Sequence, residues 1–286
     1  MVLKTIYVVR HGFRSNWVVN PSTGEYTHNF PTPTGIPSDP SLASHGVEQA
    51  TELASHLCYL TPPVDAIYSS PFYRCIQTLA PTLSQLNSRR EKSSRLRIRL
   101  DTGLAEFYGL ARFDHPRPAT LDVLQKHFPN ALDDTYRESS IESSKSGESI
   151  GTLHDRVAYA IHKIIERADA DGTETILLCT HAAVMICLGR VLTGNMPPLE
   201  SDDDFKCATC SFSKFLWDSE KPEHVPDVNW KGHGVQGRWE CEVNGDCSFL
   251  TEGEERGWSF AMDETNLDPQ LCVCTSNNQR RYHENH

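Results

Sequence analysis

The stretch Thr5-Ile6-Tyr7-Val8-Val9-Arg10-His11-Gly12-Phe13-Arg14 decides the fold of this sequence. Its first half is apolar and rich in β-branched residues, which predicts a buried strand. Gly12, at the end of that strand, lets the backbone turn and approach a ligand closely. The strand thus delivers His11, between Arg10 and Arg14, to the edge of an open α/β sheet where ligands bind, and this group suits a phosphate or a carboxylate. The alternative is a buried histidine with surface arginines.

Two later apolar segments of the same kind also end in polar residues. Residues 64–70 run into a helix whose expected cap is Ser70. Arg74 lies about one turn into that helix, from where it can reach back to the strand ends and join the pocket of the first motif. Residues 174–180 form the other strand and end at a second histidine, His181.

A cluster of basic residues precedes the next carboxylate. Counted only as charge, residues 89–95 resemble a nucleic-acid patch. However, residues 95–100 alternate arginines with apolar side chains, which is the period of a half-buried strand with one solvated face. We favour the strand, and Glu106 then stands at its exit.

Long polar segments interrupt these elements. Residues 15–44 and 111–146 are polar and proline-containing, and we expect both to be insertions over the cleft, although the first could equally be a surface excursion. Amphipathic helices are predicted over residues 47–57 and from Gly147-Glu148-Ser149 onward, because their apolar residues recur at helical spacing. With the strands, these helices predict a three-layer α/β sandwich with a mainly parallel sheet and helices on both faces.

Composition and charge limit the possible partners. The 286 residues carry a net charge of −11, so the chain as a whole should repel nucleic acid and anionic membranes. An anionic ligand must therefore be held by a local basic pocket. The sequence shows no signal-peptide pattern and no apolar stretch long enough to span a bilayer, so we expect a cytoplasmic or nuclear protein with reduced cysteines.

Together these motifs resemble the histidine phosphatase superfamily, often called phosphoglycerate-mutase-like. The resemblance covers roughly residues 4 to 195. The motifs that carry it are Arg10-His11-Gly12, residues 69–78, Gly147-Glu148-Ser149 and Thr180-His181, with residues 39–42 and 46–50 matching the segment before the first helix. Any one of these motifs would be weak alone, but their order and combination are specific.

The resemblance implies a role for each matched residue. His11 would be the nucleophile that forms a phosphohistidine. Arg10, Arg74 and His181 would hold the phosphoryl oxygens. Glu106 aligns with the carboxylic acid that protonates the leaving oxygen.

Two neighbours of the nucleophile bear on the branch of the superfamily. Arg14 matches the acid-phosphatase branch, which has an arginine three residues after its nucleophile and uses it for phosphate binding. Phe13 stands where the mutase branch has a glutamate, which counts mildly against a mutase.

The chemistry of phosphoryl transfer agrees with this set of residues. Negative charge spreads over the equatorial oxygens in the transition state, and fixed guanidinium and imidazolium donors stabilise it. An imidazole nitrogen is a competent nucleophile near neutral pH once a neighbour fixes its tautomer. This scheme requires no metal and no other cofactor.

The last third of the chain is less familiar. We predict one domain over residues 1–220, a β-hairpin extension over 221–276 packed on it, and a mobile tail over 277–286. Asn244-Gly245 is a strong hairpin signal and is the expected turn of that extension. Cys207 and Cys210 have a zinc-like spacing, but residues 206–217 also alternate like a strand, which we favour. This last segment is similar to fungal relatives of the tau subunit of transcription factor IIIC that carries a histidine-phosphatase domain.

These observations favour a metal-independent phosphatase that acts on a phosphate monoester or a diphosphate. Three alternatives stay open: a protein-interaction scaffold subunit of a transcription-type assembly, a phosphomutase, and a nucleic-acid-binding protein. The acidic charge makes the last of these the least favoured. The expected partners are a phosphorylated small molecule and, through the C-terminal extension, other proteins.

Overall fold

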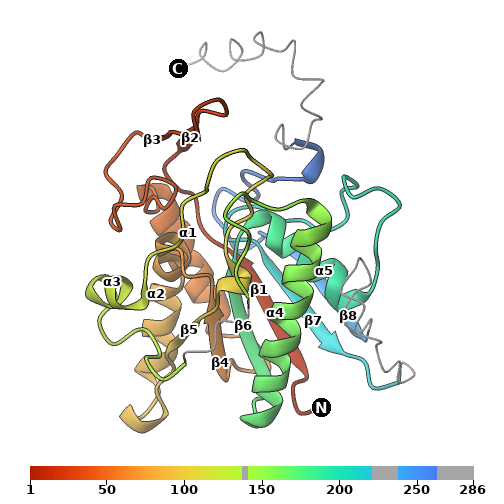
Figure 1. The fold of residues 1–286 in the computed structure, drawn as a ribbon. Coiled ribbons are helices and arrows are strands. Elements are labelled where there is room, and N and C mark those ends of the chain that lie inside the picture. Colours follow the sequence, from red (N-terminus) through yellow and green to blue (C-terminus); the bar gives the residue numbers. More distant parts are fainter. Residues whose placement is uncertain (137–140, 221–237, 263–286) are drawn as a thin grey trace.

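A computed structural model of this chain describes residues 1–136, 141–220 and 238–262. They form a six-stranded sheet in the order β5-β4-β6-β1-β7-β8, with helices on both of its faces (Figure 1). Strands β5, β4, β6 and β1 are parallel, whereas β7 and β8 continue the sheet in antiparallel fashion. The predicted α/β sandwich with a mainly parallel sheet is confirmed. The strands of this sheet are β1 (Thr5–Arg10), β4 (Ala66–Ser69), β5 (Ile98–Leu100), β6 (Thr175–Thr180), β7 (Phe212–Trp217) and β8 (Trp239–Asp246).

Two helical layers cover this sheet. Helices α1 and α2 pack against each other, and α4 and α5 do the same. Three short 3₁₀ helices and a small two-stranded sheet of β2 and β3 complete the described elements. The helices are α1 (Ser44–Leu57), α2 (Tyr73–Ser88), α3 (Leu121–His127), α4 (Ile150–Ala170) and α5 (Ala182–Thr193), and the remaining elements are β2 (Trp17–Val19), β3 (Tyr26–His28), η1 (Lys92–Ser94), η2 (Thr102–Leu104) and η3 (Phe260–Met262).

The first strand is buried because it lies inside the sheet with a hydrophobic core on each face. Ile6 and Val8 belong to the core that includes α4 and α5. Tyr7 and Val9 point to the other core, which includes residues of α1 and α2. This explains the continuous apolar run, since a parallel strand covered on both faces has no solvated side.

Helix α2 begins differently from the sequence prediction. Its cap residue is Phe72, which has no side-chain capping bond, so the predicted cap at Ser70 is wrong. The N–H of Tyr73 instead donates to both carboxylate oxygens of Asp39, at 2.9 and 3.1 Å. A negative charge at a helix N-terminus stabilises the helix, so Asp39 takes over the role expected of Ser70. Ser70 Oγ accepts a longer hydrogen bond from the N–H of Phe72, at 3.4 Å, and contacts His181.

The predicted turn at Asn244-Gly245 is also wrong, because both residues lie inside β8. The register between β7 and β8 shifts around Lys214, which marks bulges in the pair. Gly245 has φ of 67° and its N–H donates to Ser213 Oγ at 2.9 Å. The positive φ that would close a tight hairpin turn here serves a bulge in an edge strand.

In their described residues, the predicted insertions contain little regular structure. Residues 15–44 include β2 and β3, and residues 111–146 include α3. Through β8, residues after 238 extend the main sheet (Figure 1). The predicted tail at 277–286 lies outside the described residues. No helix in the described part of the chain has both the length and the apolarity to cross a lipid bilayer.

Candidate active site

The residues singled out in the sequence come together where β1 and β6 end. Arg10 ends β1 and His11 follows it, while His181 follows β6 and caps α5. Arg74 lies in the first turn of α2, and Glu106 follows η2. A pocket of about 170 Å³ at this edge is lined by Arg10, His11, Arg14, Trp17, Glu106, Phe107, Ala182, Ala183 and Trp258.

The backbone around His11 sets the state of its imidazole. The ring is buried, and Nδ1 lies 2.8 Å from the carbonyl oxygen of Gly12. A carbonyl oxygen only accepts, so Nδ1 carries the proton and Nε2 keeps its lone pair. Burial lowers the pKa of His11 well below its ordinary value of 6.5, and the nearby charges of Arg74 and His181 lower it further. His11 is therefore a neutral imidazole with a nucleophilic Nε2.

The glycine after His11 is required by close packing against α1. Its N–H donates to Thr78 Oγ1 at 3.0 Å. A Cβ atom at Gly12 would lie only 2.8 Å from the carbonyl oxygen of Gly46. The turn that presents His11 therefore depends on the absence of a side chain at both glycines, since a Cβ at Gly46 would lie 1.9 Å from the oxygen of Phe13.

Arg74 and His181 converge on the carboxylate of Glu106. Arg74 Nη2 donates to Glu106 Oε2 at 2.8 Å, and His181 Nδ1 lies 3.3 Å from the same oxygen. Arg74 is also held by Asp39 and by the carbonyl oxygen of Ser38. Burial alone would raise the pKa of Glu106, but His181 and Arg74 outweigh it and hold that pKa well below its usual range. In the protein alone Glu106 is thus an ionised carboxylate.

His181 is fixed from its other side by Ser70. Its Nε2 lies 2.8 Å from Ser70 Oγ, and its ring stands 5.2 Å from that of His11. Burial lowers the pKa of His181, but the neighbouring Cys75 and Glu106 outweigh this and raise it. The surroundings of the two histidines therefore shift their pKa values in opposite directions, downward for His11 and upward for His181.

Arg10 and Arg14 add two guanidinium groups to the pocket. Arg10 Nη1 donates to the carbonyl oxygens of Cys207 and Arg256, each at 2.6 Å. Its Nε is buried and has no hydrogen-bond partner among the described residues, which leaves one N–H unmatched beside the pocket. Arg14 lies over the ring of Trp17 at 5.5 Å, and burial lowers its pKa. The pocket therefore concentrates positive charge at His11.

The structure bears on the two possible metal sites. Within the described residues, potential ligand atoms of His11, Glu106 and His181 lie within 4.8 Å of one another. The surrounding arginines oppose a cation there and favour an anion. No such cluster in the described ranges includes Cys207 or Cys210, and Cys207 Sγ instead contacts the carbonyl oxygen of Trp258 at 3.0 Å.

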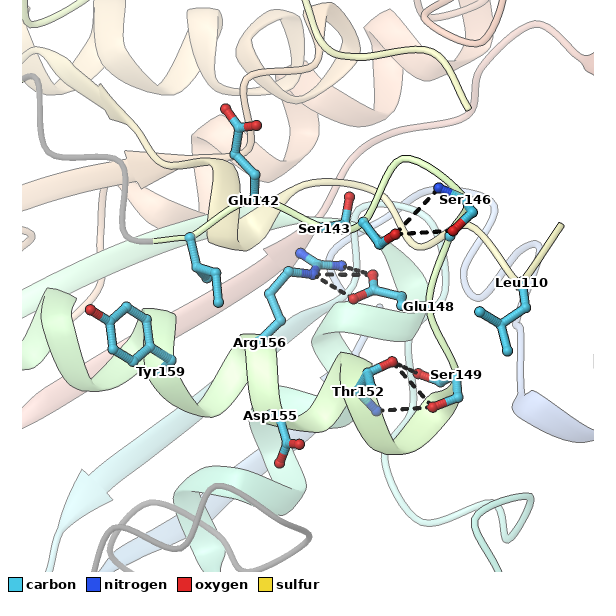
Figure 2. A pocket seen from close by; sticks show the side chains of 13 residues that line it. Leu110, Glu142, Ser143, Ser146, Glu148, Ser149, Thr152, Asp155, Arg156 and Tyr159 are labelled. Atoms are coloured by element: carbon cyan, nitrogen blue, oxygen red, sulfur yellow. Dashed lines mark hydrogen bonds and ion pairs between the residues drawn. The ribbon is translucent and has the colours of Figure 1, made fainter. Parts of the chain in front are cut away.

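A buried ion pair behind the pocket holds the loop that carries Glu106. Arg156 binds Glu148 through Nε and Nη2, at distances between 2.6 and 3.1 Å (Figure 2). Arg156 Nη1 donates to the carbonyl oxygens of Gly103 and Ala105, at 2.8 and 3.0 Å. Glu148 and Arg156 also line a larger cavity of about 570 Å³ (Figure 2), whose lining residues do not include His11.

Sequence reasoning missed the supporting residues of the site. Asp39, Ser70 and Arg156 each hold a candidate catalytic side chain or its loop. Arg156 had a visible signal, because it is a charged residue on the buried face of α4, next to Val157. Asp39 and Ser70 stood in matched motifs, but their contacts with Arg74 and His181 were not predicted because these partners are distant in the sequence.

A comparison with protein-family models finds one match. Residues 6–229 match the model described as histidine phosphatase superfamily, branch 1. The match covers more than half of the chain and includes all six candidate site residues: Arg10, His11, Arg14, Arg74, Glu106 and His181. Arg14 matches an arginine of the acid-phosphatase branch, but a match at one position does not decide to which branch the chain belongs.

Similar curated proteins include a transcription factor subunit and a phosphatase. The chain is 33% identical over 273 residues to the transcription factor tau 55 kDa subunit of Saccharomyces cerevisiae. This alignment covers 91% of this chain and 59% of that protein. The chain is also 27% identical over 258 residues to the ecdysteroid-phosphate phosphatase of Drosophila melanogaster. That alignment covers 80% of this chain and 33% of that protein. The chain thus spans between about a third and three fifths of the length of these two relatives.

A solved structure shares the fold. The ecdysone phosphate phosphatase from Bombix mori, in complex with tungstate, superposes with a TM-score of 0.56 at 19% sequence identity. The alignment covers 79% of this chain and 95% of that one. At this identity the likeness concerns the fold.

Proposed function

The chain belongs to the histidine phosphatase superfamily, and from that premise we propose that it hydrolyses a phosphate monoester or a diphosphate through a phosphohistidine on His11, without a metal ion. One observation carries the proposal. His11 Nδ1 is held by the carbonyl oxygen of Gly12, so that its Nε2 is nucleophilic, and the nucleophile lies in a pocket with Arg10 and Arg14. A neutral nucleophile among fixed cations suits attack on a phosphoryl group.

In the first step, Nε2 of His11 attacks phosphorus and the bond from phosphorus to the ester oxygen breaks. Arg10, Arg14, Arg74 and His181 hold the phosphoryl oxygens, whose negative charge they stabilise without reorganising. The leaving oxygen takes a proton from Glu106 and departs as an alcohol. The product is a phosphohistidine.

Glu106 must gain a proton before it can act as an acid. In the protein alone its pKa is held down by His181 and Arg74. A bound phosphoryl group competes for these same donors and places its own negative charge beside the carboxylate. Both effects raise the pKa of Glu106, so substrate binding itself prepares the acid.

In the second step, a water molecule attacks the phosphohistidine. Glu106, now a carboxylate, accepts a proton from that water, and the bond between phosphorus and Nε2 breaks. Inorganic phosphate leaves and His11 returns to its neutral form. The same carboxyl group thus serves as acid and then as base.

One observation favours a second function. The yeast transcription factor tau 55 kDa subunit is 33% identical over most of this chain. The alternative is therefore a scaffold subunit of a transcription-type assembly in a fungal nucleus, alone or together with phosphatase activity. A mutase is less favoured because Phe13 stands where the mutase branch has a glutamate. A cytoplasmic or nuclear location agrees with both functions.

The test of the phosphatase is hydrolysis of p-nitrophenyl phosphate in the presence of EDTA. We expect turnover by the wild type and a loss of at least about 10³-fold in His11→Ala, as for other enzymes that lose their nucleophile. His28→Ala is the matched control, because His28 is an exposed histidine on β3. Equal activity of wild type and His11→Ala would refute the covalent mechanism, and an inactive wild type would favour the scaffold.

A further inference from the structure

The C-terminal segment, residues 255–260, reaches the pocket although it follows the part of the chain that matches the family model. That match ends at residue 229. Trp258 nevertheless lines the pocket of His11, together with Trp17 and Phe107. These three side chains are called the aromatic wall below. The wall is thus completed by a part of the chain that the superfamily match does not include.

Several contacts fix the C-terminal segment against the site. The carbonyl oxygen of Arg256 accepts from Arg10, and its guanidinium lies 3.7 Å from the centre of the Phe13 ring. Glu255 accepts from Gln49 Nε2 at 2.7 Å and forms a very short contact with His45. The segment therefore contacts both the end of β1 and helix α1.

Trp258 itself is supported from behind. Its carbonyl oxygen contacts Cys207 Sγ at 3.0 Å. Its ring packs edge-to-face on Phe260 at 5.0 Å, and Phe260 packs in the same manner on Phe107 at 6.2 Å. Trp258 is half-buried, so it presents part of its ring while the rest is held in place.

The size of the pocket brings the leaving group against the aromatic wall. Its volume of about 170 Å³ lies below the range of about 300–1,000 Å³ that is typical of small-molecule sites. A phosphoryl group bound at His11 would fill part of this volume, so the atoms just beyond the ester oxygen would lie near the aromatic wall, which lines the same pocket. The charged lining residues, such as Arg10 and Glu106, are engaged with the phosphoryl group and the ester oxygen in the proposed reaction.

We propose that Trp258 is a specificity-determining residue that selects phosphate esters whose leaving group is flat and apolar next to the ester oxygen. This inference rests on the proposed function. A flat ring packs favourably on an indole, because aromatic pairs gain stability beyond the burial of their area. Hydroxyl groups of a sugar or polyol would lose water there without gaining partners, which costs free energy.

The test compares the binding of three phosphonates, which carry the same charged group but cannot be hydrolysed. Benzylphosphonate is flat and apolar, cyclohexylmethylphosphonate is apolar but not flat, and 3,4-dihydroxybutylphosphonate is polar. Dissociation constants are measured by isothermal titration calorimetry for the wild type, Trp258→Ala and Trp258→Phe. Tyr59→Ala is the control, because Tyr59 is 75% exposed and does not line the pocket.

We expect the wild type to bind benzylphosphonate about tenfold more tightly than the dihydroxybutyl compound, a difference of about 1.4 kcal/mol. The cyclohexylmethyl compound should fall between them. Trp258→Ala should lose most of this preference, whereas Trp258→Phe and Tyr59→Ala should keep it.

Three results would overturn the inference: equal binding of all three compounds by the wild type, an equal loss for all three in Trp258→Ala, or no binding of any of them. The second result would mean that Trp258 only supports Arg10 through the C-terminal segment. Selective binding without turnover of any ester would keep this inference and refute the phosphatase. Turnover that depends on His11, with equal binding of the three phosphonates, would support the phosphatase and refute the role of Trp258.

Discussion

The basic side of the pocket and its aromatic wall come from different kinds of structure. On the basic side, Arg10, His11 and His181 stand at the ends of neighbouring buried strands, and Arg74 comes from a helix packed on that sheet. The wall instead takes Trp17 from a polar insertion and Trp258 from the C-terminal segment. The difference separates two tasks: the sheet fixes the chemistry, and connecting segments far apart in the sequence shape the space for the leaving group.

The largest expected effect concerns Glu106, the proposed general acid, which lies beside the arginines and histidines of the pocket. Glu106→Gln keeps the size of the side chain but removes its titration. We expect glycerol phosphate to be hydrolysed about 10²–10⁴-fold more slowly, because its alkoxide leaving group needs a proton. p-Nitrophenyl phosphate should slow far less, since its phenolate leaves readily.

Steady-state rates with both substrates measure this difference. Equal slowing of both substrates would remove Glu106 from the role of acid. A greater slowing of glycerol phosphate would distinguish Glu106 from the aromatic wall, because a substitution in the wall should change substrate binding instead of protonation of the leaving group.

The next effect concerns the ion pair that holds the Glu106 loop. Glu148→Ala leaves the buried Arg156 unpaired, which should cost about 3–5 kcal/mol of the free energy of unfolding. Urea denaturation measures this loss. Glu142→Ala is the matched control, because Glu142 pairs with Arg117 at the surface and should change stability by less than about 1 kcal/mol.

The same variant tests whether the pair positions Glu106. A displaced carboxyl group should slow glycerol phosphate more than p-nitrophenyl phosphate. Glu148→Gln keeps one acceptor for Arg156 and should show both effects in weaker form. A stability loss with equal slowing of the two substrates would assign the pair a purely structural role.

The smallest effect compares His11 on the basic side with His45, which contacts Glu255 of the C-terminal segment. Burial lowers the pKa of His11, whereas a hydrogen bond to Glu255 raises that of His45. The neutral His11 thus contributes stability that is present above its ordinary pKa of 6.5 and is lost as the pH falls. His45 contributes stability that is present below 6.5 and is lost as the pH rises through its raised pKa.

Titration followed by nuclear magnetic resonance should show these opposite shifts. In urea denaturation, His45→Gln should lower stability at pH 6 by less than about 1 kcal/mol, since the pair is partly exposed. At pH 9 the variant and the wild type should agree. A difference that is the same at both pH values would show that the proton of His45 does not contribute.

The sequence predicted the fold and the basic side because local patterns encode both. The apolar run before Arg10-His11-Gly12 indicates a buried strand, and the polar residues and the glycine that follow indicate where this strand ends. His181 follows the same rule, since it directly succeeds the buried β6. Helix α4 was predicted from the apolar stripe that follows Gly147-Glu148-Ser149, and in the structure Ser149 caps it.

What the sequence could not predict depends on contacts between distant segments. Asp39 replaces Ser70 at the start of α2 because the loop before α1 returns to that helix, which no local pattern records. The Asn244-Gly245 pair fits a turn and a bulge equally well, and pairing with β7 decides for the bulge. Trp258 lies 247 positions after His11, so its place in the aromatic wall follows only from the sheet that β8 completes.

The most direct test of the account is to trap the covalent intermediate. The protein is mixed with p-nitrophenyl phosphate, quenched in alkali, in which phosphohistidine is stable, and digested for mass spectrometry. We predict that the peptide containing His11 gains the mass of one phosphoryl group, and that this modification is absent from His11→Ala. Turnover without any modified His11, or with the phosphoryl group on His181 instead, would contradict the account.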